Sequence, residues 1–245
     1  ISRDVTQLER VQTVLRDFVA NVSHELRTPL TVVGGFLETL LDLEDPDPAA
    51  LRRYMQMMQA QTERMKRLVE DLLTLSRLES NAHSAPEERI NMPALLQSLL
   101  VEAQGLSQGR HQIELAATGD SWLVGSADEL HSAFGNLISN AVRYTPEGGM
   151  IRLAWASDRN GGLFSVTDSG IGIEARHISR LTERFYRVDR GRSRETGGTG
   201  LGLAIVKHVL ARHQATLEIS SEPGRGSRFA VRFPAQRLIS APLAV

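Results

Sequence analysis

The 245-residue chain contains no cysteine. This absence excludes disulfide bonds, thiolate catalysis and cysteine-bound zinc sites, and it fits a reducing compartment. Aromatic residues make up only 5% of the chain, and the formal net charge is -1. Because neither sign of charge is in excess, we expect no nucleic acid and no anionic membrane surface as a partner.

Long hydrophobic runs are also missing. The longest run falls short of the roughly 18 apolar residues that would cross a bilayer, and the sequence has no signal peptide. The chain begins at Ile1 rather than Met, so we expect it to be a piece of a longer protein. At roughly 100–200 residues per domain, its length predicts two domains.

An apolar repeat with spacings of three and four residues occupies the first third of the chain. The repeat predicts helices over about residues 4–42 and 48–80, separated by a loop from Asp42 to Pro48. Two helices cannot enclose a core. We therefore expect an all-α helical hairpin that pairs with a second copy as a homodimeric four-helix bundle.

A polar stretch from Asn81 to Glu88 marks the boundary to a second domain. Beyond it, helical and strand-like patterns alternate, which predicts an α+β sandwich with a largely antiparallel sheet. The predicted helices cover residues 92–104, 127–144 and 201–211, and the predicted strands cover residues 111–116, 150–157, 163–168, 216–220 and 228–233. From about Pro234 onward we predict a frayed end.

A histidine of the first helix lies off the apolar stripe. With Val19 and Val22 at core positions of the repeat, His24 falls at a position that faces water. An isolated histidine there is usually an ordinary surface residue. Glu25 could accept a hydrogen bond from one ring nitrogen and leave the other as a nucleophile, although adjacent residues on a helix diverge by about 100°.

Two further residues strengthen the functional interpretation of His24. Thr28 lies one turn on and shares its face. Pro29 removes a backbone donor and bends the helix, at a cost of about 3 kcal/mol. Stability alone does not explain that cost, whereas a bendable helix beside a reactive histidine does.

Three segments of the second domain carry residue types suited to a nucleotide. Asn136 and Asn140 share one face of a helix. Asp168 ends a strand and is followed by two glycines, which let the backbone approach a flat ligand. The run from Gly197 to Gly202 precedes a helix, where free N–H groups favour phosphates. Each segment alone is weak evidence, and the glycine run matches neither the P-loop nor the Rossmann pattern.

Together and in this order, the motifs resemble those of the sensor histidine kinases. The segment from Phe18 to Leu30 is similar to their phospho-acceptor box. The segment from Asn136 to Gly202 is similar to their Bergerat ATP-binding fold, which gyrase-type topoisomerases, mismatch-repair ATPases and a chaperone family share. The run from Arg180 to Asp189, and a PAS-exit-like tripeptide from Asp4 to Thr6, resemble the phosphate regulon sensor kinases.

This resemblance covers essentially the whole chain and implies its organisation. A signalling linker would span residues 1–16, a dimerisation and histidine phosphotransfer domain 17–82, a catalytic ATP-binding domain 83–236 and a tail 237–245. The partners would be a second copy of the chain and the receiver domain of a response regulator. The chain would be the cytoplasmic portion of a bacterial inner-membrane protein, attached to the membrane only through regions outside it.

The resemblance also implies roles for the candidate residues. His24 would be phosphorylated, with Glu25 as its acid/base partner, and Thr28 would orient water for dephosphorylating the regulator. ATP and Mg2+ are the implied cofactors, and Asn140 would bind Mg2+ with help from Asn136. The other residues implied to hold ATP are Arg143, Tyr144, Asp168, Gly170, Gly172, Phe185, Arg187, Gly198, Thr199, Gly200, Leu201 and Gly202.

Within that set, Asp168 would accept a hydrogen bond from the adenine amino group, and the residues from Gly198 to Gly202 would hold the triphosphate. Residues from about Phe185 to Gly198 would form a mobile lid, and some of the arginines in this region would meet the γ-phosphate.

Hydrolytic members of the superfamily place a glutamate four residues before the metal-binding asparagine. That position is Asn136 here, an amide that cannot act as a base, so we expect poor ATP hydrolysis. The sequence therefore predicts ATP-dependent autophosphorylation of His24 and transfer to an aspartate of a regulator, with phosphatase activity and a role in phosphate-starvation sensing. Two alternatives stay open: an ATPase that clamps a dimer, and a dimeric scaffold without kinase activity.

Overall fold

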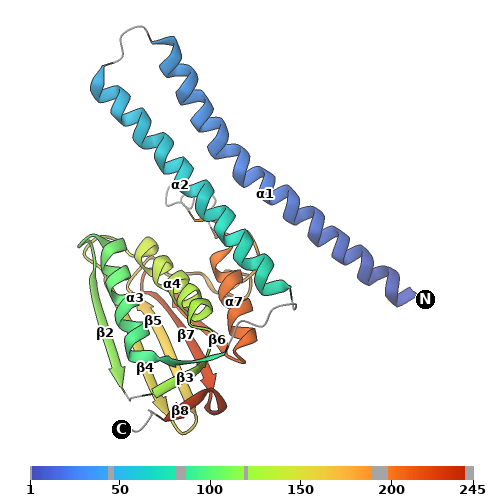
Figure 1. Cartoon of the computed structure of the whole chain (residues 1–245), viewed down its shortest axis with the longest axis vertical. Helices are drawn as coiled ribbons and strands as arrows, with labels where there is room; N and C mark the ends of the chain where they lie inside the picture. Colours follow the sequence, from blue (N-terminus) through green and yellow to red (C-terminus); the bar gives the residue numbers. More distant parts are fainter. Residues whose placement is uncertain (1, 44–46, 81–86, 119–120, 189–197, 241–245) are drawn as a thin grey trace. The chain divides into compact units, whose positions relative to one another are not determined.

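Figure 1 shows a computed structural model of the chain, which describes residues 2–43, 47–80, 87–118, 121–188 and 198–240. The chain divides into two compact units. One contains residues 1–73 and 193–199, and the other contains residues 74–192 and 200–245. No helix of the described residues is long and apolar enough to cross a membrane.

Two long helices form the predicted hairpin. Helix α1 spans Ser2–Asp42 and continues through Pro29, and helix α2 spans Pro48–Glu79. Asp47 caps α2, because its carboxylate accepts hydrogen bonds from the backbone N–H groups of Ala49 and Ala50 at 3.3 Å. The predicted helix boundaries are confirmed to within two residues.

The seam between α1 and α2 is largely apolar. Pro29 is buried in the hairpin, and the rings of Phe36 and Tyr54 lie 5.4 Å apart between their centroids. A second set of apolar side chains stays exposed on the single chain, namely Val19, Leu30, Leu37, Leu41, Met55 and Val69. The hairpin therefore leaves a wide apolar surface uncovered by its own two helices.

A five-stranded sheet forms the centre of the second unit. Its strands are β2 (Gln112–Thr118), β4 (Met150–Asp158), β5 (Gly161–Asp168), β7 (Gly226–Pro234) and β6 (Thr216–Glu222), in the order β2-β4-β5-β7-β6. Strands β2 and β4 are parallel, and the other neighbours are antiparallel. This arrangement confirms the predicted α+β sandwich.

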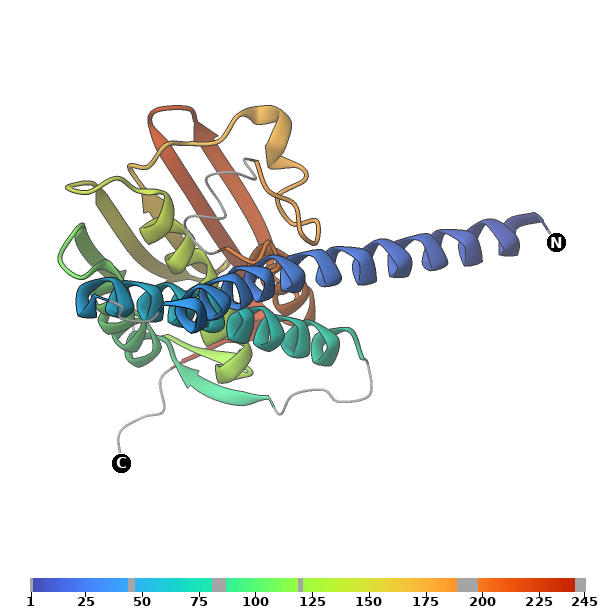
Figure 2. The ribbon, with the colours of Figure 1, turned by 90° about the horizontal axis from the view of Figure 1, so that it is seen from above.

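Three helices cover one face of this sheet (Figures 1 and 2). They are α3 (Met92–Ser107), α4 (Ala127–Tyr144) and α7 (Gly202–Arg212). Phe134 of α4 anchors the core, because its ring centroid lies 4.0 Å from that of Phe164 and 6.2 Å from that of Phe233. Because the Phe134 side of α4 is buried against the sheet, the other side of the helix is left for the candidate nucleotide site.

A small second sheet and two short helices were not predicted. Strands β1 (Glu88–Asn91), β3 (Ser121–Gly125) and β8 (Leu238–Ser240) pair in the order β1-β3-β8. The short elements are α5 (Ala175–Ile178) and the 3-10 helix η1 (Ala235–Arg237). The predicted frayed end from Pro234 is wrong for residues 235–240, because β8 pairs with β3 in an antiparallel register.

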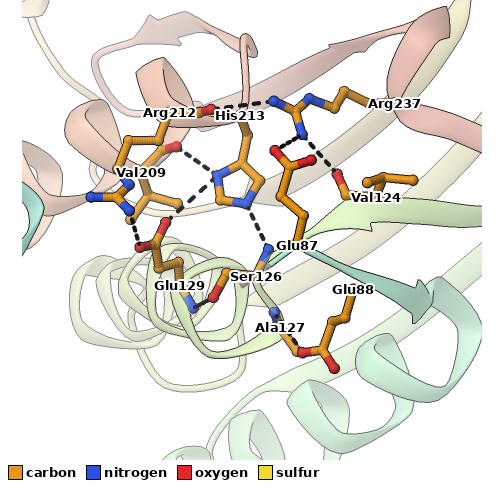
Figure 3. Close-up of polar contacts among 10 residues, drawn as sticks. All are labelled: Glu87, Glu88, Val124, Ser126, Ala127, Glu129, Val209, Arg212, His213 and Arg237. Atoms are coloured by element: carbon orange, nitrogen blue, oxygen red, sulfur yellow. Dashed lines mark hydrogen bonds and ion pairs between the residues drawn. The ribbon is translucent and has the colours of Figure 1, made fainter. Parts of the chain in front are cut away.

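A polar network joins the end of α7 to the start of α4 (Figure 3). The ring of His213 is buried, and its Nε2 accepts a hydrogen bond of 3.0 Å from the backbone N–H of Ser126. Nδ1 lies 2.8 Å from the carbonyl oxygen of Val209, which can only accept. His213 is therefore neutral, with its proton on Nδ1.

Two ion pairs flank this histidine. Arg212 contacts Glu129 at 3.2 Å, and Arg237 contacts Glu87 at 2.5 Å. Burial lowers the pKa of His213, opposed by its bond to the Val209 carbonyl and by the Glu129 carboxylate. The network ties the unpredicted C-terminal elements to the two helices that build the candidate nucleotide site.

Candidate active site

His24 is exposed on α1, as predicted. Thr28 lies one turn further on, and its hydroxyl donates a hydrogen bond of 3.2 Å to the backbone carbonyl of His24. The two side chains therefore sit on one exposed face of the helix. A macromolecule that docks over the His24 ring would also meet the Thr28 side chain.

The Glu25 carboxylate takes a partner that sequence reasoning missed. Glu25 is half-buried, and its Oε2 accepts a hydrogen bond of 2.9 Å from Nη2 of Arg64 on α2. The sequence left open whether Glu25 faces the His24 ring, because adjacent residues on a helix diverge; here the Glu25 side chain points toward the seam. One signal could have pointed to Arg64: it falls on the inward face of α2, with Gln61 and Leu68 one turn away on either side.

Helix α4 supplies the first part of the second site. Ser126 caps the helix, since its hydroxyl accepts from the backbone N–H of Glu129. The face away from the core carries the predicted nucleotide residues, which are half-buried: Asn136, Asn140, Arg143 and Tyr144. The Asn136 amide nitrogen donates to the backbone carbonyl of Ser132 at 2.9 Å, so its orientation is set by the helix itself.

Asp168 stands at the end of β5 and is 7% exposed. Its Oδ1 accepts hydrogen bonds from the backbone N–H groups of Gly170 at 2.8 Å and Ser227 at 3.3 Å. Burial raises the pKa of Asp168, and these two backbone bonds oppose the increase. A carboxylate kept in a buried position at a cost in stability is typical of a binding site.

The loop after Asp168 closes onto the end of α4. The backbone N–H of Ile171 donates to the carbonyl of Tyr144 at 3.2 Å. A Cβ on Gly170 would lie 2.5 Å from the same carbonyl oxygen, and a Cβ on Gly172 would lie 2.0 Å from the carbonyl oxygen of Glu222. Both glycines are required by close backbone approach, which brings Asp168 and Tyr144 to one site.

The start of α7 meets α4 at Asn136. A Cβ on Gly202 would lie 2.3 Å from Oδ1 of Asn136, so only glycine leaves this amide in place. Just before the helix, Gly200 has φ +75° and its carbonyl accepts a hydrogen bond of 2.8 Å from the backbone N–H of Phe185. Leu201 between these glycines is fully buried. Gly200, Gly202, Asn136 and Phe185 therefore belong to one structural site.

For other residues, the predicted role in binding the nucleotide stays a prediction. Gly198 and Thr199 group with the other compact unit, so their role in holding a triphosphate stays a prediction. Most of the predicted lid, including Arg190, Arg192 and Arg194, lies outside the described residues. Arg187 is described and half-buried, and its contact with a phosphate also stays a prediction.

The donor set fits a nucleotide with Mg2+. The described residues contain no group of three or more His, Asp or Glu side chains that could hold a metal ion. A metal here would take amide oxygens from Asn136 and Asn140 together with phosphate oxygens, and Mg2+ commonly binds through few protein ligands in this way. The Asp168 carboxylate can accept from an adenine amino group, beside backbone that glycine leaves open.

Two family models match the chain. Residues 14–81 match the His Kinase A (phospho-acceptor) domain. Residues 125–237 match the histidine kinase-, DNA gyrase B- and HSP90-like ATPase family. The phosphate regulon sensor protein PhoR of Pseudomonas aeruginosa is 55% identical over 237 residues, which are 96% of this chain and 53% of that protein.

The chain belongs to the sensor histidine kinases.

Other sensor histidine kinases are also similar to the chain. PhoR of Haemophilus influenzae is 38% identical over 98% of this chain and 56% of that protein. The histidine kinase AdeS of Acinetobacter baumannii has a solved structure that matches with a TM-score of 0.68 and 25% identity, over 86% of this chain and 98% of that one. The chain spans about half the length of the curated PhoR relatives it matches.

Proposed function

We propose that this sensor histidine kinase portion phosphorylates its own His24 with ATP and passes the phosphoryl group to an aspartate of a response regulator. One observation carries the proposal. The same chain contains an exposed histidine beside Thr28 on a helical hairpin and a second unit in which closely packed glycines set Asp168 against the end of α4 and Asn136 against the start of α7.

One unit would bind the nucleotide, and the other would supply the histidine that is phosphorylated. Asp168 would bind the adenine, and Asn136 and Asn140 would hold Mg2+, which offsets the charge of the phosphates. A ring nitrogen of His24 attacks the γ-phosphorus, the new N–P bond forms as the bond to the β-phosphate oxygen breaks, and ADP leaves. By the resemblance to the family, Glu25 would take up the proton released from the imidazole, which requires its carboxylate to leave the contact with Arg64.

The site is suited to phosphoryl transfer rather than hydrolysis. In this superfamily a glutamate at the position of Asn136 activates water, and an amide cannot accept the proton. The bound nucleotide would therefore keep its γ-phosphoryl group until His24 is presented. This feature favours a kinase over an ATPase that uses hydrolysis to clamp a dimer.

The partners follow from the surface of the hairpin. The exposed apolar set on α1 and α2 would be covered by a second copy, giving a four-helix bundle. A response regulator would dock over the exposed face that carries His24 and Thr28. The fold of the chain is also that of a histidine kinase ThkA solved in complex with the response regulator protein TrrA, with a TM-score of 0.74.

The likeness to PhoR supports a role in the response to phosphate. The PhoR of Pseudomonas aeruginosa, at 55% identity over nearly the whole chain, is named a phosphate regulon sensor. We place the chain on the cytoplasmic side of a longer membrane-anchored protein, whose remaining length would carry the sensor.

One assay separates the kinase from the two alternatives. The chain is incubated with Mg2+ and γ-labelled ATP, and the label is followed on protein and in solution. A histidine kinase gives protein label that is stable to alkali and lost in acid. Free phosphate without protein label would indicate an ATPase, and neither product would indicate a scaffold. Asn140→Ala, which removes the proposed metal ligand, is the matched control and should give neither product.

A further inference from the structure

Phe185 has a backbone conformation that residues other than glycine seldom adopt. Its φ is +61°, in the left-handed region that a bulky side chain makes unfavourable. The residue lies in a turn closed by a hydrogen bond of 3.3 Å from the backbone N–H of Tyr186 to the carbonyl of Glu183. Turns that need a positive φ at this position ordinarily have glycine there. A strained conformation of this kind persists only where the surrounding structure holds it, and such residues gather at binding sites.

This conformation directs the backbone N–H of Phe185 at the loop before α7. The N–H donates a hydrogen bond of 2.8 Å to the carbonyl of Gly200, and a Cβ on Gly200 would lie 2.9 Å from Cα of Phe185. The next residue, Leu201, is the N-cap of α7 and has no side-chain oxygen to bond the first backbone N–H groups of that helix. In the proposed function these N–H groups meet the phosphates. The backbone of Phe185 therefore helps to place the segment Gly200–Gly202.

Two side chains that precede the turn hold Tyr186. The Tyr186 hydroxyl oxygen lies 2.6 Å from Nδ1 of His177, and the guanidinium carbon of Arg180 lies 4.3 Å from the centroid of the tyrosine ring. Nε of Arg176, which can only donate, lies 3.3 Å from Nε2 of His177. Neutral His177 therefore carries its proton on Nδ1 and donates it to the Tyr186 hydroxyl oxygen.

We infer that Tyr186 is a positioning residue for the segment Gly200–Gly202, and that its bond with His177 keeps Phe185 in the conformation on which this segment depends. Tyr186 is held at its backbone by Glu183 and at its hydroxyl by His177. Phe185 therefore cannot relax to a negative φ without disturbing one of these two bonds. Tyr186 acts on the position of the segment and not on the nucleotide itself. This inference rests on the proposed kinase function.

The two ends of the proposed nucleotide site provide the test. Adenine would bind at Asp168, which a different loop positions, whereas the phosphates would meet the segment Gly200–Gly202. The affinities of the whole chain for ATP with Mg2+, and for adenosine, which lacks phosphates, are measured by calorimetry. Tyr186→Phe keeps the ring beside Arg180 and removes the hydroxyl. ATP affinity should fall about three- to tenfold, the loss of one hydrogen bond between neutral groups, and adenosine affinity should not change.

Variants of His177 show whether the Tyr186 hydroxyl acts through this histidine. His177→Ala should lower ATP affinity by the same factor, and adding Tyr186→Phe to it should lower the affinity no further. His177→Asn keeps an N–H donor near the place of Nδ1 and should recover part of the affinity. Tyr54→Phe is the matched control, because it removes the same hydroxyl from the hairpin unit and should leave both affinities unchanged.

The outcomes separate this inference from the function on which it rests. If Tyr186→Phe weakens ATP and adenosine binding by the same factor, the hydroxyl supports the whole domain and the inference is wrong. It is also wrong if ATP affinity does not change, or if Tyr186→Phe costs as much in the His177→Ala background as in the parent chain. If the parent chain binds no ATP, the proposed function itself fails and the inference fails with it.

Discussion

Replacing Asp168 with asparagine should separate adenine recognition from folding. In the folded domain Oδ1 accepts hydrogen bonds from the backbone N–H groups of Gly170 and Ser227. An asparagine can keep both bonds through its amide oxygen. Its NH2 group then replaces the second carboxylate oxygen, which is the one left to face a ligand. The substitution therefore changes a hydrogen-bond acceptor into a donor with little change in shape.

The size of the effect follows from the bond that is lost. An adenine amino group is a donor and would now meet a donor. Hydrogen bonds to charged groups contribute about 1.5–3 kcal/mol, and about 1.4 kcal/mol corresponds to a factor of ten in affinity. ATP binding should weaken about ten- to a hundredfold. Guanine presents an acceptor at this position, so GTP binding should weaken much less.

The stability of the folded chain, unlike its affinity for ATP, should stay the same or rise in Asp168→Asn. Burial raises the pKa of Asp168 in the folded state. The folded chain therefore binds the proton more tightly than the unfolded chain, and the stability contributed by this group is lost as pH rises through the folded pKa. Asparagine does not titrate. At neutral pH Asp168→Asn should thus unfold at the same or a higher urea concentration than the parent chain, while it binds ATP more weakly.

Calorimetry with ATP and GTP, and urea unfolding followed by tryptophan fluorescence, measure both effects. Trp122 and Trp155 both lie in the second unit, so the fluorescence reports that unit. The matched control is Asp158→Asn, in which the carboxylate accepts from the backbone N–H of Asn160 in a surface turn. Equal losses of affinity for the two nucleotides would refute adenine recognition, as would a loss of stability that accounts for the weaker binding.

Two further predictions concern Thr28 and His213. Thr28→Ala should spare autophosphorylation but slow dephosphorylation of the regulator, on the order of tens-fold for a contact that positions water. The two steps are timed separately. If only the kinase step slows, Thr28 acts on the helix before Pro29 instead. Burial lowers the pKa of His213, so its contribution to stability is present above the unfolded pKa of about 6.5 and is lost as pH falls through the folded pKa. Urea unfolding between about pH 8 and pH 5 should show a steeper loss for the parent chain than for His213→Asn, and equal slopes would contradict a buried neutral histidine.

Long periodic elements could be predicted from the sequence, and short paired ones could not. Helix α4 was predicted with its observed bounds, Ala127–Tyr144, because Ser126 is a strong N-cap and the apolar period is regular. Strands β1, β3 and β8 have only three to five residues each, and none of them shows a regular alternation of apolar and polar residues. They are stabilised by pairing across the chain, as β8 is with β3.

The candidate sites divide in the same way. Spacing along one helix placed His24 with Thr28, and Asn136 with Asn140, because residues one turn apart share a face. The tertiary contacts gave no local signal. Glu25 and Arg64 are 39 residues apart, and the approach of Gly202 to Asn136 depends on how α7 packs against α4. A prediction from local pattern identified the residue types of the sites but not these partners.

The measurement that tests the kinase assignment most directly is the position of the phosphoryl group. The whole chain is incubated with ATP and Mg2+, digested at alkaline pH, and its seven histidines are examined by mass spectrometry. We expect phosphorylation at His24 in the parent chain. The His24→Gln variant should carry no phosphohistidine. Its affinity for ATP should be nearly unchanged, since the exposed ring packs against little. A phosphoryl group on another histidine, or label retained in His24→Gln, would contradict the assignment.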